Sequence, residues 1–498
     1  MTTGLLSVEA YLRTHGPTLS SDLSAYFQRA GLGPAAARKR IERSGEEVRR
    51  LRRIRLPHNQ RFLYLEDQFG KKPFRERLID GLDRVRSVFG HALFALETRG
   101  GIVPKPYFSI ISGCPERLRG HLASGTILEI LEELGAVFVE NIDELGPCVH
   151  LAWTDQQISP AAAKARFITE DILVFGVMEW LRKLGLVSFS AVKARKLVVQ
   201  PDFGSVRWDI VGPSYISALT TNRGGKTMSG FLAADVFIND LDERSVRYFV
   251  HKFSLLRSNA KLRPLIAMLV AGGFSPEAMK VLKSTGILCP TVGNLLGGEI
   301  FESLLALLRT LENAAAVAAT DPDQIYTLFT KLGSFEGALG RMRGAMFELI
   351  VAHAVQAGQG GSVDVGKRVL NPKTGESAEI DVLRVQPRAL GFYECKGYGP
   401  KQLVTREEVQ YWSETQIPRF REWAEANAAF AHHQKSFEFW TSSGFTTEAI
   451  EYLRSRWANT RKFSVCWRYG AEVSAFVEKY AAPSVLKTLK EFYAQDFA

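Results

Sequence analysis

The nine residues GFYECKGYG (391–399) carry a glutamate and a lysine two positions apart in an otherwise apolar run. In a β-strand, residues two apart point to the same face, so Glu394 and Lys396 share one face while Cys395 points to the other. Two opposite charges at the end of a buried strand form either a partly buried ion pair or half of a catalytic site. The residues that precede this stretch help to choose between an ion pair and a catalytic site.

A second strand and a helix come before it. AEIDVLRVQ (378–386) predicts a strand in which Asp381 stands among isoleucine, valine and leucine. RGAMFELIVAHAVQAG (343–358) predicts a helix with an apolar stripe and Glu348 at the margin of that stripe. One hairpin is enough to bring the aspartate next to the glutamate of the first stretch.

A helix with glutamate, a strand with aspartate and a strand with Glu-x-Lys resemble, in this order, the PD-(D/E)XK nuclease superfamily, also called the restriction-endonuclease-like fold. The resemblance covers about residues 335–470. Ile380 stands where the family name has a proline. What the resemblance implies is a metal-dependent phosphodiester hydrolase with an α/β core.

The resemblance also implies a set of catalytic residues: Glu348, Asp381, Glu394 and Lys396. Phosphodiester hydrolysis uses a cation that neutralises charge and lowers the pKa of bound water. Mg²⁺ is held by one or two carboxylates together with waters and phosphate oxygens. The three carboxylates are therefore expected to hold Mg²⁺, with Mn²⁺ as the alternative ion, and the lysine to orient the attacking water. A surface ion pair stays open as the alternative, because a short pattern of this kind also arises by chance.

The middle of the chain repeats this order of segments. The first three matched segments are FGVMEWLRKLG (175–185), KLVVQPDFGSVRWDIV (196–211) and GFLAADV (230–236). The match sets Glu179 and Asp209 against the helix glutamate and the strand aspartate of the other copy. It sets Ala233 and Asp235 where the glutamate and lysine of Glu-x-Lys stand. We therefore expect residues 165–295 to form a degenerate nuclease-like domain without a complete metal site; two unrelated α/β units are the alternative.

The formal charge of +10 is concentrated near the N-terminus, where residues 1–72 hold fourteen Lys/Arg against seven Asp/Glu. Three short helices followed by a basic hairpin resemble the winged-helix form of the helix-turn-helix over about residues 1–68. In that family the third helix enters the major groove of DNA. The basic residues of that helix are Arg38, Lys39, Arg40 and Arg43. The resemblance implies that they contact duplex DNA; a protein-interaction module or a solvated basic surface are the alternatives.

A second module of the same kind is expected at residues 74–155. Its third-helix candidate carries Glu129, Glu132 and Glu133, which would repel phosphate. We expect this module to pack or to position rather than to read DNA.

The whole chain is expected to be a multidomain protein of the α/β and α+β classes. The expected domains are residues 1–70 and 74–155 (winged-helix modules), 165–295 (degenerate nuclease-like domain), 296–334 (helical connector) and 335–498 (active nuclease domain). A DNA endonuclease is favoured; a ribonuclease of the same fold and a non-catalytic DNA-binding regulator are the alternatives. Foreign-DNA restriction or phage defence is a suggestion from fold-level analogy alone.

Location and partners follow from weaker signals. The N-terminus lacks the features of a signal peptide, no apolar run is long enough to span a membrane, and five scattered cysteines suit a reducing cytoplasm. We therefore expect a cytoplasmic protein that does not enter a membrane. Cutting both strands needs two sites, which is compatible with a homodimer, and partner proteins of a defence or repair system are a further expectation.

Overall fold

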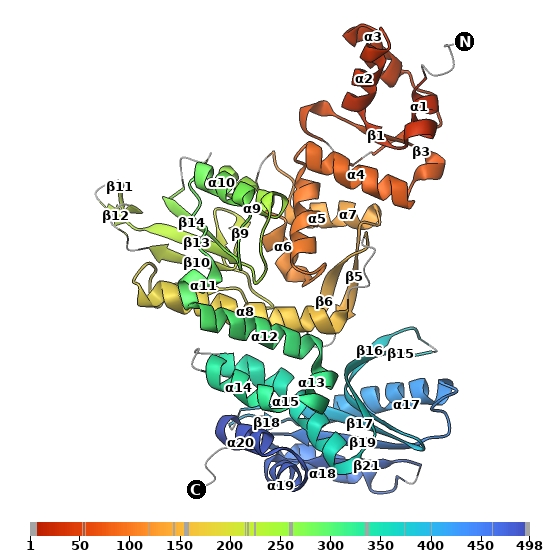
Figure 1. Cartoon of the computed structure of the whole chain (residues 1–498), viewed down its shortest axis with the longest axis vertical. Coiled ribbons are helices and arrows are strands. Elements are labelled where there is room, and N and C mark those ends of the chain that lie inside the picture. Colours follow the sequence, from red (N-terminus) through yellow and green to blue (C-terminus); the bar gives the residue numbers. More distant parts are fainter. Residues whose placement is uncertain are drawn as a thin grey trace. The chain divides into compact units, whose positions relative to one another are not determined.

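The computed structural model describes residues 7–493, apart from residues 52, 55, 119, 143–144, 154–158, 215, 217–218, 224–225, 258–261, 334–337, 373, 400 and 461. The chain forms two compact units, of which unit 1 holds residues 1–158 and 180–292 and unit 2 holds residues 159–179 and 293–498. Helix α8 (Pro160–Lys183) therefore contributes to both. Helices and strands occur in each unit, so the protein is a mixed α/β multidomain chain (Figure 1). The expected domain boundary at residue 335 lies outside the described residues.

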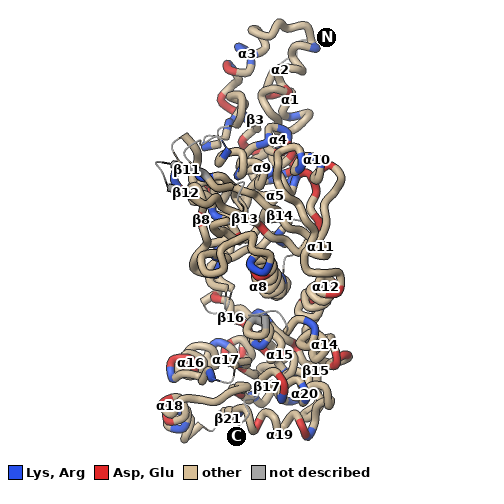
Figure 2. Tube along the Cα trace, turned by 90° about the vertical axis from the view of Figure 1, so that its left-hand side faces the viewer, with Lys and Arg blue, Asp and Glu red and all other residues tan. Residues whose placement is uncertain are grey.

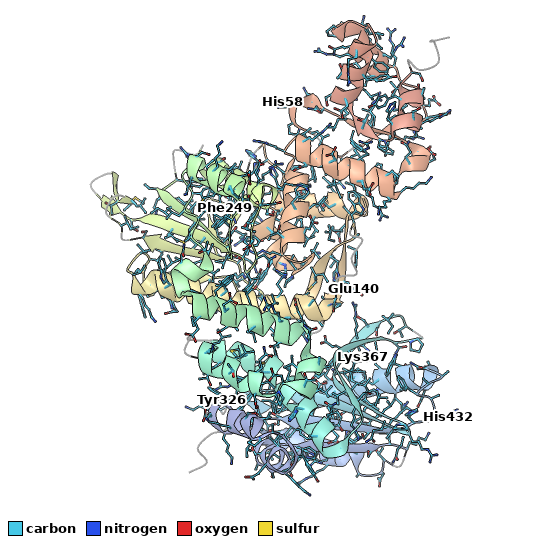
Figure 3. The ribbon with its side chains drawn as sticks, viewed as in Figure 1. His58, Glu140, Phe249, Tyr326, Lys367 and His432 are labelled. Carbon is cyan, nitrogen blue, oxygen red and sulfur yellow. The ribbon has the colours of Figure 1, made fainter. Side chains whose placement is uncertain are left out.

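Unit 1 begins with three helices and a hairpin, as the sequence predicts. The elements are α1 (Val8–His15), β1 (Thr18–Leu19), α2 (Ser20–Arg29), α3 (Pro34–Glu42), β2 (Val48–Arg50) and β3 (Phe62–Leu65), which form a sheet of order β1-β3-β2. Ser7 caps α1 through its side chain, and Pro34 starts α3, where its missing N–H costs nothing. His58, labelled in Figure 3, lies between the two hairpin strands with a positive φ of 56°.

A second module of unit 1 has the same order of elements after one extra helix, α4. It contains α4 (Lys72–Arg84), α5 (Val88–Thr98), β4 (Ile102–Pro104), α6 (Phe108–Ile111), α7 (Ser124–Glu133), β5 (Val137–Ile142) and β6 (Gly146–Leu151), with sheet order β4-β6-β5. Two acidic residues of α7 meet the first module, since Arg53 lies 4.0 Å from Glu129 and also pairs with Glu133. These three side chains are largely exposed, so the contacts are surface ion pairs within unit 1.

The rest of unit 1 is built on a four-stranded sheet of order β14-β13-β10-β7. Its elements are β7 (Lys193–Ala194), β8 (Asp202–Phe203), β9 (Val206–Arg207), β10 (Ile210–Ser214), β11 (Thr221–Arg223), β12 (Lys226–Met228), β13 (Gly230–Val236), α9 (Glu243–Arg257), β14 (Leu265–Val270), α10 (Pro276–Thr285) and α11 (Val292–Leu296), the last of which continues into unit 2. Strand β10 is antiparallel to β7 and β13, whereas β13 and β14 are parallel. Parallel bridges from Met268 to Leu288 and from Ala271 to Thr291 add a further edge segment.

Unit 2 carries a five-stranded sheet of order β15-β16-β17-β19-β21. Its elements are α12 (Gly298–Glu312), α13 (Ala314–Thr320), α14 (Asp323–Leu332), α15 (Ala338–Gln359), β15 (Ser362–Leu370), β16 (Ser377–Gln386), β17 (Ala389–Lys396), β18 (Leu403–Val404), α16 (Arg406–Tyr411), a π-helical turn (Trp412–Gln416), α17 (Ile417–Ala426), β19 (Gln434–Thr441), β20 (Gly444–Phe445), α18 (Thr447–Trp457), β21 (Ser464–Arg468), α19 (Gly470–Tyr480) and α20 (Pro483–Phe492). The first three strands are antiparallel, and β17, β19 and β21 run parallel.

Helices cover both faces of this sheet because its strands are apolar on both sides. Phe392, Phe437 and Phe439 pack in one cluster with apolar residues of α16, α17 and α18. On the alternate positions, Tyr393 and Trp440 pack in contact with each other, and Trp440 meets Phe476 of α19. The strand that carries Glu-x-Lys is therefore held in the middle of a three-layer unit.

The two larger sheets follow one order. In each, two antiparallel pairings are followed by parallel pairings, with helices between the parallel strands. The small parallel pair β18–β20 of unit 2 has a counterpart in the parallel bridge from Leu241 to Phe274 in unit 1. Residues 165–295 and 335–470 thus share a helix, an antiparallel part and a parallel part in this order, and the first span also contains the small antiparallel pairs β8–β9 and β11–β12.

Candidate functional site

The candidate site of unit 2 lies where β16 and β17 pair. Val382 faces Tyr393 in the antiparallel register, so the next residues, Asp381 and Glu394, stand opposite each other. Asp381 is 9% exposed and Glu394 is 6% exposed. Lys396 donates from Nζ to Glu394 Oε1 at 2.8 Å, and its own side chain keeps 22% of its surface exposed. A buried carboxylate pair is thus joined to a lysine that solvent can reach.

A backbone hydrogen bond fixes the aspartate. The N–H of Cys395 donates to Asp381 Oδ2 at 2.7 Å, which ties the carboxylate of β16 to the strand carrying Glu-x-Lys. Glu348 is a half-buried residue of α15. Burial raises the pKa of the Cys395 thiol well above its usual value, and the charges of Asp381, Glu348 and Glu394 add to this. The charges of the three predicted carboxylates and of Lys396 thus all act on the Cys395 thiol, which itself points to the other face of the strand.

The segment after Lys396 is held tightly against its neighbours. The Lys396 carbonyl accepts hydrogen bonds from Thr441 Oγ1 at 3.0 Å and from the Ser442 N–H at 3.1 Å. A Cβ at Gly397 would lie 2.2 Å from the Arg343 carbonyl oxygen of α15. Only glycine lets this segment and α15 approach so closely, which keeps the helix that carries Glu348 beside the end of β17.

A cation bound at this site would need ligands from the side chains around it. Among the residues that the structure describes, His, Cys, Asp and Glu side chains do not gather in threes or more in a way that would hold a metal ion. Mg²⁺ does not require such a cage, because it keeps several waters and is bound through one or two carboxylates. The facing pair Asp381 and Glu394 fits that requirement by donor type.

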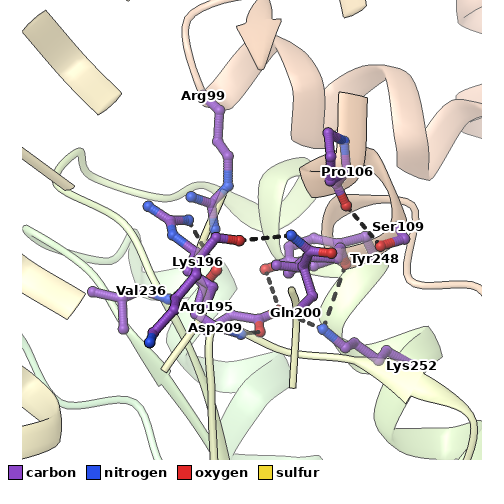
Figure 4. Close-up of polar contacts among 12 residues, drawn as sticks. Arg99, Pro106, Ser109, Arg195, Lys196, Gln200, Asp209, Val236, Tyr248 and Lys252 are labelled. Atoms are coloured by element: carbon purple, nitrogen blue, oxygen red, sulfur yellow. Dashed lines mark hydrogen bonds and ion pairs between the residues drawn. The ribbon is translucent and has the colours of Figure 1, made fainter. Parts of the chain in front are cut away.

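Unit 1 contains a second cluster of buried charges, shown in Figure 4. Asp209 accepts hydrogen bonds from Arg99 Nη2 at 2.8 Å and from Arg195 Nη1 at 2.9 Å. Asp235 accepts from Lys252 Nζ at 2.7 Å and from the Tyr248 hydroxyl at 3.0 Å. The cluster joins the C-terminal end of α5, the segment after β7, the residue before β10, the strand β13, and α9.

The pairing register corrects the alignment made from the sequence. Ile210 faces Ala234, so Asp209 stands opposite Asp235, just as Asp381 stands opposite Glu394. Asp235 therefore takes the place of the glutamate rather than that of the lysine, and Ala233 is not at the site.

The cause of the error is a slip of two residues. Aligning the shared Gly-Phe of the two strands assumes an equal distance to the acidic residue, but the acidic residue comes two positions later in β13. A slip of two keeps every side chain on its proper face, so the hydrophobic pattern does not reveal it.

The hydrogen bonds of the two clusters also correspond. The N–H of Val236 donates to Asp209 Oδ2 at 2.8 Å, as that of Cys395 does to Asp381. Lys252 pairs with Asp235 at 2.7 Å, as Lys396 does with Glu394 at 2.8 Å. A lysine is therefore present in unit 1, but it comes from α9 instead of the strand.

The cluster of unit 1 is closed to solvent. The exposed fractions of Arg99 and Arg195 are 2% and 3%, and those of Asp209, Asp235 and Lys252 are 0%. Burial alone would raise the pKa of Asp209, but the guanidinium groups of Arg195 and Arg99 lower it to about 2. For Asp235 burial prevails and raises the pKa, with the charge of Asp209 adding to the effect.

The cations of the cluster also lie on aromatic faces. Arg99 stacks on Phe237 at 4.2 Å, and Lys252 lies 4.1 Å from the centre of the Trp208 ring. The guanidinium groups of Arg99 and Arg195 occupy both oxygens of Asp209, the aspartate that corresponds to Asp381. The pairing of Arg99 with Asp209 could not be predicted from the sequence, because the two residues lie 110 positions apart.

The basic residues of α3 form a separate candidate surface. Arg38, Lys39, Arg40 and the C-cap residue Arg43 are exposed, and α3 buries Ala37 and Ile41. The blue positions at α3 in Figure 2 mark its basic residues.

The basic hairpin is less open than its sequence suggests. Arg49 pairs with Glu66 at 2.9 Å, and Arg50 donates to the Ile41 carbonyl at 2.8 Å. Arg52 and Arg55 lie outside the described residues.

Comparisons with known proteins add little to this geometry. No protein-family model matches the chain, and no curated protein does. A solved structure described as "Structure of EndoMS-dsDNA2 complex" is similar over 29% of this chain and 50% of that chain, with 10% sequence identity and a TM-score of 0.16. The match spans half the length of that chain, and a TM-score this low supports no conclusion about fold or function. None of the described helices is long and apolar enough to cross a membrane.

Proposed function

We propose that this chain is a metal-dependent nuclease of the PD-(D/E)XK type, which hydrolyses phosphodiester bonds at Asp381, Glu394 and Lys396. The observation that carries the proposal is the arrangement at the end of β17. Two buried carboxylates face each other there, and a partly exposed lysine is bonded to one of them.

Each residue has a role that its surroundings favour. Asp381 and Glu394 would hold Mg²⁺ or Mn²⁺, and Glu348 would steady a water of that ion. The bound cation would supply charge neutralisation and a more acidic water. Lys396 is close enough to the carboxylates to orient the water and exposed enough to meet a phosphate.

DNA is the favoured substrate, because the exposed basic residues of α3 follow two helices and precede a hairpin, the order of a winged-helix module. Phosphate contacts by such residues supply affinity for a duplex without reading its sequence. We also propose that the protein works in the cytoplasm, that it acts as a homodimer, and that it has partner proteins in defence or repair.

We further propose that the sheet of unit 1 is a copy of the nuclease sheet whose site has been closed. The matching strand order and the matching bonds of Asp209 and Asp381 support this. In the closed copy, the positive charges of Arg99 and Arg195 take the place of a divalent cation.

The proposed activity is tested by incubating the purified full chain with labelled duplex DNA, single-stranded DNA and RNA, with Mg²⁺, with Mn²⁺ or with a chelator. We expect metal-dependent cleavage of DNA. Cleavage of RNA alone would favour the ribonuclease, and binding of DNA without cleavage under every condition would favour the regulator.

A further inference from the structure

Three parallel strands of unit 2 end at the same edge of the sheet as the proposed site. Lys396 faces Thr441 in the register of β17 and β19, and Trp440 faces Arg468 in that of β19 and β21. Tyr469, the next residue, is therefore level with Thr441 and Lys396. Neighbouring strands lie about 4.8 Å apart, so two strand spacings place Tyr469 roughly 10 Å from Lys396.

Tyr469 is an exposed aromatic residue on a fixed backbone. Tyr469 is 44% exposed. Its own N–H donates to Glu472 Oε2 at 3.2 Å, and the following Gly470 N–H donates to the Ser443 carbonyl at 2.8 Å. A large aromatic ring that is anchored at its backbone and offers its surface to solvent is suited to contact a ligand rather than to fill a core.

A second exposed apolar side chain lies beside the turn that follows β19. Leu403 faces Gly444 in the parallel pair β18–β20, and it is 46% exposed. Its Cδ2 lies 3.2 Å from where a Cβ of Gly444 would be. The turn from Thr441 to Gly444 thus contacts Leu403 through Gly444 and is hydrogen-bonded to Gly470, the residue after Tyr469.

This combination fits one class of ligand. A nucleotide strand presents phosphates for Lys396 and flat apolar base faces for Tyr469. In a fully paired duplex the base faces are stacked on one another, whereas an unpaired base can stack on an aromatic side chain. The first turn of α19 carries Glu472, whose negative charge disfavours a phosphate at that helix terminus, so we assign the phosphate contact to Lys396.

We propose that Tyr469 stacks on an unpaired base next to the phosphate that Lys396 contacts, so that the enzyme prefers an unpaired nucleotide at its cutting site. This inference rests on the proposed function and specifies its substrate. Tyr469 acts here as a positioning residue that selects substrate, and it takes no part in the hydrolysis.

Binding to a cleavage-deficient chain tests this directly. In an Asp381→Asn background, the affinity is measured for a paired duplex, for the same duplex with one unpaired 2-aminopurine, and for a single strand, all without added metal. We expect the unpaired substrates to bind more tightly, and the 2-aminopurine fluorescence to be quenched on binding. Tyr469→Ala should weaken binding of the unpaired substrates about tenfold, within the range of one base–aromatic stack, and should leave the paired duplex nearly unchanged.

The controls separate stacking from folding. Tyr469→Phe should keep the preference because the ring remains. Tyr480→Ala, at the far end of the same helix and 37% exposed, should bind all substrates like the parent. In the active chain, Tyr469→Ala should raise KM with little change in kcat.

Equal weakening on paired and unpaired substrates, no weakening at all, or no binding of unpaired substrates by the parent would each overturn the inference. Each result is independent of cleavage. A chain that shows the stacking preference but cuts nothing would disprove the proposed function while leaving the base-binding site in place.

Discussion

Asp209 and Asp235 belong to one buried cluster, but their surroundings move their pKa values in opposite directions. Asp209 is paired with two guanidinium groups and stays ionised, whereas burial favours the neutral form of Asp235. Asp209→Asn would remove the negative charge that two buried guanidinium groups face, so we expect a loss of about 3–5 kcal/mol of unfolding free energy. Asp235→Asn should cost clearly less. Urea unfolding, followed by hydrogen exchange of β10 amides, measures both; equal costs would contradict this description of the charges.

His91 predicts a dependence of stability on pH. It is buried in α5, its ring lies 5.7 Å from that of His251, and burial together with nearby positive charge lowers its pKa to about 3. The folded state thus binds the proton less well than the unfolded state, whose histidine titrates near 6.5. Stability is fully present above pH 6.5 and is lost as the pH falls toward 3, by at most about 1.4 kcal/mol per pH unit.

The check is hydrogen exchange of α5 amides at pH 7.5 and pH 5, in the parent and in His91→Leu, with rates corrected for the intrinsic effect of pH. The parent should lose protection at the lower pH, and the variant should lose less. A variant with the full pH dependence of the parent would show that His91 is not the group responsible.

At the scale of elements, the contact between α15 and the end of β17 depends on Gly397, which has no side chain. Gly397→Ala would place a Cβ 2.2 Å from the Arg343 carbonyl oxygen and 2.6 Å from Phe347 Cβ. Both contacts are with rigid parts of α15, so the helix and the strand end must separate, and we expect both stability and cleavage to fall.

Gly340→Ala is the matched control in the same helix, where the new Cβ meets nothing within 4 Å. It should stabilise the chain by roughly 0.5–1 kcal/mol, because alanine loses less conformational entropy than glycine in a helix. Thermal unfolding and a cleavage assay compare the two. Normal cleavage by Gly397→Ala would show that this close approach is not needed.

The elements themselves were largely readable from sequence. Helical spacing predicted the helix that carries Glu348, and period-two patterns predicted the strands with Asp381 and Glu394. Strand register was harder, as the misplaced Ala233 shows, because a shift by two residues keeps the hydrophobic face inward and leaves the pattern unchanged.

At the scale of the molecule, contacts between residues that lie far apart in the sequence are the hardest feature to predict. The candidate site of unit 2 is built mostly from one hairpin, so its residues could be named in advance. The closed cluster of unit 1 draws Arg99 from the end of α5, Asp209 from the residue before β10 and Lys252 from α9. A buried charge that pairs with a group far along the chain leaves no periodic signal in either segment.

Binding of nucleic acid by the whole chain should depend steeply on salt if α3 supplies phosphate contacts. Each contact releases counterions and contributes about −0.9 to the slope of log affinity against log salt. Replacing the basic residues Arg38, Lys39, Arg40 and Arg43 by glutamate should flatten that slope for duplex DNA. Fluorescence anisotropy over a salt series measures it, and an unchanged slope would mean that this helix is only a solvated basic surface.

The proposed hydrolysis is tested most directly by comparing two aspartates of neighbouring strands. Asp381 faces the proposed site on β16, whereas Asp364 lies on β15 and pairs with Lys367 near the surface (Figure 3 labels the lysine). With end-labelled DNA and Mg²⁺, Asp381→Asn should lower the rate of cleavage by more than about 10³-fold and keep DNA affinity, while Asp364→Asn should cleave like the parent. Cleavage at the parent's rate by Asp381→Asn would contradict the account.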